Sequence, residues 1–95
     1  SLIKDILPTY ASGKLELINS GELSISQRLR QGMGALYHSF EYPNIATKEF
    51  DEISRIFKDD YSNMTESDWS EIKAGSDPEE TIEYIQLIRN KLWQY

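Results

Sequence analysis

The residues of this chain that could carry chemistry are many carboxylates and one histidine, and cysteine is absent. An ordinary zinc site at His38 would need several carboxylates to converge on a single imidazole. The Glu-x-x-His pattern of di-iron bundles needs a histidine on each of two helices, which one histidine cannot supply. We therefore interpret His38 as a structural or surface residue, and we predict no metal and no other cofactor.

Paired carboxylates at helical spacing are the main argument for an enzyme. Glu49 with Glu52, and Glu79 with Glu83, would share one face of a helix and could serve as acid and base. Such a pair also needs a desolvated pocket, and a chain of 95 residues has little room for one. Acids near helix starts are favoured by the helix dipole without any chemistry. We predict no catalytic residue, and an enzyme is the least favoured class.

Two short motifs resemble ligand-binding loops but lack their essential parts. Gly32-Met33-Gly34 has the glycine spacing of a nucleotide fingerprint, yet it falls inside a helical pattern with no preceding strand. The segment Asp59 to Met64 begins like a calcium loop, but the glycine at the sixth position and the closing glutamate are out of register. Neither motif predicts a phosphate or calcium site.

The negative charge of the chain is concentrated in one stretch. The formal net charge is -6, and between residues 59 and 83 the only base is Lys73. The acids of that stretch are Asp59, Asp60, Glu66, Asp68, Glu71, Asp77, Glu79, Glu80 and Glu83. A field of this sign repels phosphate backbones and anionic lipid and attracts basic proteins. Direct binding of nucleic acid or membrane is therefore disfavoured.

Aromatic residues accompany these acids, namely Tyr61, Trp69, Tyr84, Trp93 and Tyr95. Aromatic side chains anchor binding hot spots, while surrounding charges give rate and specificity. The spacing of Trp93 from the preceding apolar residues favours a place in the core, and for Trp69 core and surface remain equally open. The partner-binding surface that the sequence predicts consists of Asp59, Asp60, Tyr61, Glu66, Asp68, Trp69, Glu71, Asp77 and Glu80.

The elements that must position these residues are helical, because apolar residues recur every three or four positions along the chain. A first helix follows residues 3–18, with a kink at Pro8 or a short first turn before the main helix, and ends at Gly21. A second begins at Ser24, where Ser24 and Gln27 form a capping box, and ends before Pro43. Within it, Gly32 and Gly34 predict close approach of a neighbouring helix.

Three further helical segments complete the chain. Thr47 is the expected cap of a third helix that extends to about Tyr61. Thr65 to Asp68 can cap a short helix that Gly75 closes, and Asp77-Pro78 is a strong start signal for the last helix. The residues expected to face inward are Ile3, Leu7, Tyr10, Ala11, Leu15, Ile18, Ile25, Leu29, Met33, Leu36, Tyr37, Phe40, Phe50, Ile53, Ile56, Phe57, Tyr61, Ile72, Ile82, Ile85, Ile88, Leu92 and Trp93.

The fold class follows from these segments. No alternating run of β-branched residues is present, so we predict an all-α protein, a compact antiparallel bundle of four main helices plus one short helix. The length suits a single domain over residues 1–95. The sequence lacks cysteine, a signal-peptide core and any long apolar run, which favours a soluble, cytoplasmic protein.

Part of the sequence resembles a known group of proteins. The stretch Leu15 to Glu22, then Ile25 and Leu29, then Thr47 to Ile53, is similar to the small helical immunity proteins of bacterial polymorphic toxin and contact-dependent inhibition systems, including the MafI type. The similarity covers roughly residues 15–57, under half of the chain. It implies a cytoplasmic protein that neutralises a cognate toxin domain, often a nuclease, by covering its active site or a nearby surface.

Three functional hypotheses follow. The first is an immunity-type inhibitor that binds a basic toxin domain through the acidic surface as a monomer or weak homodimer, and the charge distribution supports it independently. The second is a phage or mobile-element protein that mimics DNA and blocks several nucleic-acid-binding enzymes. The third is a structural or adaptor bundle that self-associates through its aromatic end.

Overall fold

Five helices make up the protein in a computed structural model that describes residues 2–41 and 48–94, with side chains from residue 9 onward. They are α1 (Leu2–Ile18), α2 (Ile25–Glu41), α3 (Lys48–Ser62), α4 (Glu66–Lys73) and α5 (Pro78–Leu92). No strand occurs within these ranges, so the prediction of an all-α fold with four main helices and one short one is confirmed. None of the helices in these ranges is both long and apolar enough to cross a membrane.

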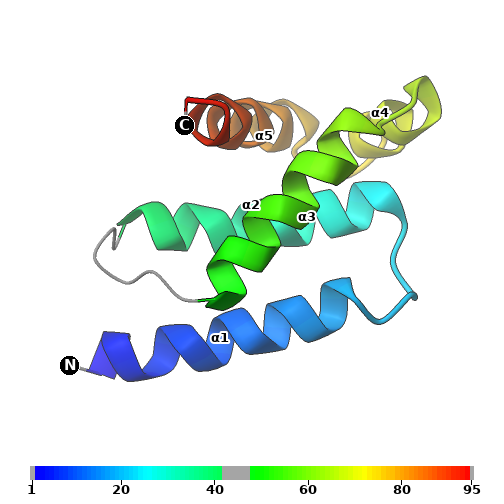
Figure 1. Ribbon diagram of the computed structural model, residues 1–95. Coiled ribbons are helices and arrows are strands. Elements are labelled where there is room, and N and C mark those ends of the chain that lie inside the picture. The colour runs from blue at the N-terminus through cyan, green and yellow to red at the C-terminus, as the bar shows by residue number, and fades with distance from the viewer. Residues whose placement is uncertain (1, 42–47, 95) are drawn as a thin grey trace.

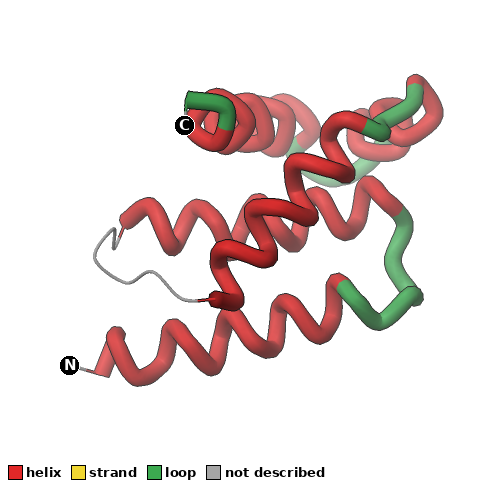
Figure 2. Tube along the Cα trace, in the orientation of Figure 1, coloured by secondary structure: helices red, strands yellow, loops and turns green. Residues whose placement is uncertain are grey.

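α2 is the central helix of the bundle. It packs against α1, α3, α4 and α5. Figure 1 shows α1 and α2 running in opposite directions, with α3 crossing them obliquely and α5 returning on the far side of α2. Short turns join most of the helices (Figure 2). The end of α3, the whole of α4 and the start of α5 therefore lie together at one end of the molecule.

Local capping sets the starts of α2 and α4, as predicted. At α2, the amide of Ser24 donates to Oε1 of Gln27 at 2.9 Å, and the amide of Gln27 donates to Oγ of Ser24 at 3.1 Å. At α4, Thr65 and Asp68 form the same reciprocal pair. Each pair satisfies amides that have no partner within the helix, and so fixes where the helix begins.

Other predicted boundaries differ in detail. α1 is a single helix from Leu2 to Ile18, so Pro8 does not separate a first turn from it. Gly21 has the left-handed backbone expected of a helix stop, with φ of 80°. Asp77 precedes α5 but makes no side-chain capping bond, because its backbone is also left-handed, with φ 50° and ψ 52°. The predicted stop at Pro43 and cap at Thr47 lie outside the described residues.

The core forms where four helices meet around α2. Its fully buried large side chains are Leu29, Leu36, Ile53, Phe57, Ile85 and Ile88. A Cβ built on Gly32 would lie 3.6 Å from Cδ2 of Phe57, so the predicted close approach of a second helix is confirmed there. At Gly34 nothing lies within 4 Å, and the same prediction is wrong.

Two residues expected to face inward lie on the surface. Tyr37 is 37% exposed and Trp93 is 38% exposed. Tyr37 lies on the flank of α2 beside the buried Leu36, and Trp93 lies just beyond the last turn of α5, where the core ends. The other inward predictions from residue 9 onward are buried or half-buried. The side chains of Ile3 and Leu7, and the whole of Tyr95, are outside the described part.

Candidate functional site

The residues predicted to bind a partner belong to the last turns of α3, to α4 and to the first turn of α5, and these segments occupy one end of the bundle (Figure 1). We call this region the acidic end and define it by five exposed carboxylates. They are Asp59, Glu66, Glu71, Asp77 and Glu80. Among acids, the prediction also included Asp60 and Asp68, whose positions are different.

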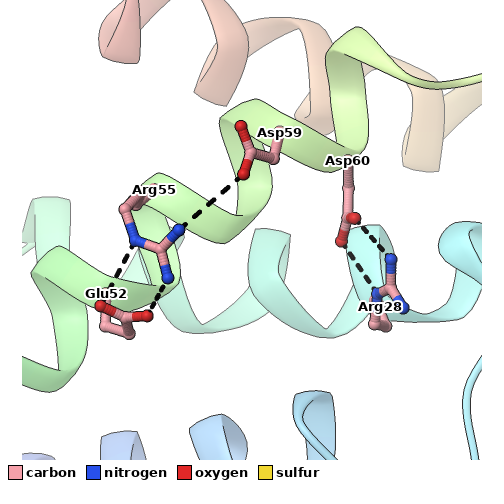
Figure 3. A network of polar contacts seen from close by, with 5 residues as sticks. All are labelled: Arg28, Glu52, Arg55, Asp59 and Asp60. Carbon is pink, nitrogen blue, oxygen red and sulfur yellow. Dashed lines mark hydrogen bonds and ion pairs between the residues drawn. The ribbon is translucent and has the colours of Figure 1, made fainter. Parts of the chain in front are cut away.

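Asp60 is a structural residue and the prediction that it lies on the docking surface is wrong. Its side chain is only 7% exposed. Arg28 of α2 donates from Nε to Oδ2 at 3.1 Å and from Nη2 to Oδ1 at 2.6 Å (Figure 3). The bonds to Asp60 raise the pKa of the Arg28 guanidinium, so Arg28 stays charged. The pair ties α3 to α2 and leaves Asp60 closed to a partner.

Asp59, the adjacent residue, points to the opposite side of α3 (Figure 3). Its side chain is 73% exposed, and its Oδ2 lies 3.8 Å from Nη1 of Arg55. Arg55 is also bonded to Glu52, which lowers the pKa of that carboxyl group. An exposed pair at this distance is screened by water and salt, so Asp59 remains able to meet a second cation.

The two other carboxylates of α4 are partly used by the fold. Asp68 is half-buried and accepts hydrogen bonds from the Thr65 amide and hydroxyl, both at 3.0 Å. Glu71 is exposed and accepts a hydrogen bond at 3.1 Å from Oγ of Ser24, the residue just before α2. Asp68 therefore shapes the site by capping α4, whereas Glu71 keeps an exposed carboxylate above the contact between α2 and α4.

Three acids of this region are exposed and have neither an ion pair nor a side-chain hydrogen bond among the described residues. Glu66 begins α4, Asp77 precedes α5, and Glu80 lies in the first turn of α5. None of the three forms an ion pair with another side chain in residues 9–41 and 48–94. Their negative charge is therefore directed to solvent, where it can act on an approaching molecule.

Tyr61 and Trp69 belong to one aromatic cluster that joins three helices. The Tyr61 ring is stacked on Phe57, meets Trp69 edge-on with centroids 5.9 Å apart, and lies 5.7 Å from Trp93. The Tyr61 hydroxyl donates to Oε1 of Gln86 of α5 at 3.3 Å. Both Tyr61 and Trp69 are half-buried against the core, so only part of each side chain is accessible to a partner.

Sequence reasoning missed the cations that surround Trp93. Nζ of Lys58 lies 5.2 Å from the indole centroid, and Cζ of Arg89 lies 5.1 Å from it. Lys91 covers the ring of Phe40 at 5.5 Å. Arg89 and Lys91 lie in the last turn of α5, where the helix dipole favours cations, and this position is the signal that could have found them.

The residues considered for chemistry do not converge. His38 is exposed, its Nδ1 lies 3.9 Å from Glu41, and its ring packs edge-on against Tyr10. Of the carboxylate pairs, Glu52 is bonded to Arg55, while Glu79 and Glu83 are exposed to solvent. In the part of the chain that the structure describes, no three histidines or carboxylates are grouped as metal ligands.

Comparison with protein-family models, with curated proteins and with solved structures found no match for this chain. The similarity to immunity proteins therefore remains an expectation from the sequence.

Proposed function

We propose that this chain is an immunity-type protein that binds and neutralises a basic toxin domain through the acidic end. The observation that carries the proposal is the group Glu66, Asp77 and Glu80, exposed at one end of the bundle and without ion pairs among the described side chains. Asp59 and Glu71 add two further exposed carboxylates to the same end.

The physical basis of binding is complementary potential. A protein that acts on nucleic acid carries a basic surface, because it must contact phosphates. Carboxylates held on rigid helices attract such a surface over a distance of about 10 Å at moderate salt. They raise the association rate, while contacts at the centre of the interface determine how long the complex lasts. The accessible parts of Tyr61 and Trp69 supply those central contacts in this proposal.

The experiment begins with the immobilised chain and a lysate of the bacterium that encodes it. Proteins that bind at low salt and elute at high salt are identified and then produced alone. The proposal expects one basic protein that inhibits growth on expression, and growth restored when this chain is expressed with it. If the eluted proteins are several unrelated nucleic-acid-binding proteins that DNA also displaces, the chain is a DNA mimic instead.

Two variants of equal charge distinguish the site from the net charge. The site variant carries four changes at the acidic end, namely Glu66→Gln, Glu71→Gln, Asp77→Asn and Glu80→Gln. The control variant carries four changes at exposed acids elsewhere, namely Glu16→Gln, Glu22→Gln, Glu41→Gln and Asp51→Asn. Each variant is immobilised in turn. The toxin should be retained by the immobilised control variant and should not be retained by the immobilised site variant. Equal retention by both variants would contradict the assignment of the surface.

A further inference from the structure

The outward face of α5 carries a regular series of exposed residues, of which Lys91 also lies 5.5 Å from the centroid of the Phe40 ring of α2. Glu83, Leu87 and Lys91 are all exposed and follow each other at intervals of four residues, so they form one stripe along the helix. Leu87 is 41% exposed and lies between Glu83 and Lys91 on the same face of the helix. The stripe therefore runs from an acid, through an apolar centre, to a base.

The apolar centre extends beyond Leu87 onto α2. Tyr37 of α2 is 37% exposed and meets Tyr84 of α5 edge-on, with centroids 5.3 Å apart. Tyr84 and Leu87, together with Glu80, Glu83, Gln86 and Asn90, line a shallow hollow on the outside of α5. An apolar centre bordered by charged residues has the composition of a small protein interface.

The charges of α5 are arranged so that the helix complements its own reversed copy. Glu79, Glu80 and Glu83 occupy its first half, and Arg89 and Lys91 its last turns. If a second α5 packs antiparallel with Leu87 against Leu87, residues at equal distances from the centre face each other. Glu83 and Lys91 are each four residues from Leu87, about 6 Å along a helix, so each Glu83 meets a Lys91.

We propose that this chain forms a twofold-symmetric dimer through the outward face of α5, with Leu87 at the axis and Glu83 of each copy facing Lys91 of the other. The twofold axis doubles every contact, as in other isologous interfaces. A parallel arrangement would bring like charges together and is disfavoured. The proposal does not depend on the immunity function, since Glu66, Glu71 and Asp77 lie outside the stripe, although Glu80 of the acidic end borders the same hollow.

The interface is small, and so the dimer is weak. One helix face with Leu87, Tyr37 and Tyr84 at its centre falls in the size class of transient contacts rather than obligate dimers. The two ion pairs are solvent-exposed, so added salt weakens them. Dimer should therefore form at high protein concentration and low salt, and dissociate on dilution.

Sedimentation velocity of the whole chain, from micromolar to millimolar concentration at low salt, tests the proposal through charge exchange. Glu83→Lys alone and Lys91→Glu alone each replace two attractions by two repulsions, and each should weaken dimerisation about tenfold. The double variant Glu83→Lys/Lys91→Glu restores opposite charges across the axis and should dimerise like the unaltered chain. Glu16→Lys on α1 and Lys48→Glu on α3 make the same charge changes at exposed sites off the stripe, and should leave dimerisation unchanged.

Three results would overturn the dimer. If the unaltered chain stays monomeric at millimolar concentration, the proposed dimer does not form. A dimer that both single variants leave intact uses another surface. Weakening by both single variants without recovery in the double variant would exclude the antiparallel pairing of Glu83 with Lys91. Circular dichroism of each variant, expected to match the unaltered chain because both positions are exposed, separates these results from misfolding.

Discussion

The two sides of α3 use the same residue types for opposite purposes. On the side facing α2, Arg28 and Asp60 form a bidentate pair in which the aspartate is 7% exposed. On the other side, Glu52, Arg55 and Asp59 form a ladder in which Asp59 is 73% exposed (Figure 3). Of these two neighbouring aspartates, Asp60 is therefore buried and Asp59 is exposed.

The difference shows that burial, not charge type, decides what a carboxylate contributes. A pair with a buried member holds two helices in one register, because the buried charge has no water to replace a lost partner. An exposed ladder contributes little to folding, since water and salt screen it. The exposed carboxylates are consequently free to serve binding, and the following predictions test that division.

The largest effect is expected at Asp60. Asp60→Ala leaves the Arg28 guanidinium without its partner and should lower the free energy of unfolding by about 3 kcal/mol. This value is at the lower end of the range for breaking a buried ion pair, because the Arg28 side chain is 30% exposed. Asp59→Ala, one residue away, should change it by less than about 0.5 kcal/mol. Urea unfolding of both variants provides the measurement. Equal losses would remove the distinction between the two sides.

A smaller loss is expected at Ser26, which is buried on α2 and donates from Oγ to the backbone oxygen of Asp68 at 2.8 Å. Ser26→Ala removes this tie between α2 and α4 and should cost about 1 kcal/mol. Ser70→Ala on the exposed side of α4 is the matched control and should be nearly neutral. Thermal unfolding of the two variants compares them, and a neutral Ser26→Ala would mean that the tie contributes nothing.

Replacement of Asp77 should raise the stability of the fold, whereas replacement of Asp60 should lower it. Its left-handed backbone, with φ 50°, is unfavourable for a residue with a side chain, and it makes no capping bond in return. Asp77→Gly relieves the strain and should raise stability by about 0.5 kcal/mol, after the greater chain entropy of glycine is subtracted. Gly21→Ala, at φ 80°, should lower stability by about 1 kcal/mol. Loss of stability in Asp77→Gly would give this surface acid a structural role.

The smallest effect is expected at acidic pH, for the exposed pair of Glu52 and Arg55. The bond to Arg55 lowers the pKa of Glu52 below its unfolded value, so the stabilisation it gives is present above the unfolded pKa and is lost as pH falls through the folded pKa. Glu52→Gln should therefore slightly flatten the dependence of unfolding free energy on pH in the acidic range. Urea unfolding between neutral and acidic pH measures the slope, and an unchanged slope would show that the exposed pair has no net effect.

Local features of the fold could be predicted from the sequence, because they depend on neighbouring residues. The capping boxes at Ser24 and Thr65 and the stop at Gly21 each need only a few adjacent positions, and all three were found. The failures involve contacts between distant residues. Arg28 lies 32 residues from Asp60 and Ser24 lies 47 residues from Glu71, and no local pattern pairs them.

The grouping of the acids could be predicted from their place in the chain, but the side of the helix that each acid faces could not. The acids from Asp59 to Glu80 do lie at one end of the molecule, since α4 and the start of α5 pack together. Asp60 was assigned to the wrong side of α3, although it follows Phe57 by three residues and so continues the buried series of Phe50, Ile53 and Phe57. That spacing is consistent with an inward position for one acid of the pair.

The central proposal is that exposed carboxylates of the acidic end, rather than the total charge of the protein, bring the proposed toxin domain to this surface. The most direct test is the association rate constant of the isolated toxin domain with the site variant and with the control variant, which carry equal net charge, measured over a series of salt concentrations. The account predicts a slower rate and a shallower salt dependence for the site variant, with the control close to the unaltered chain. Identical rates for the two variants would contradict it.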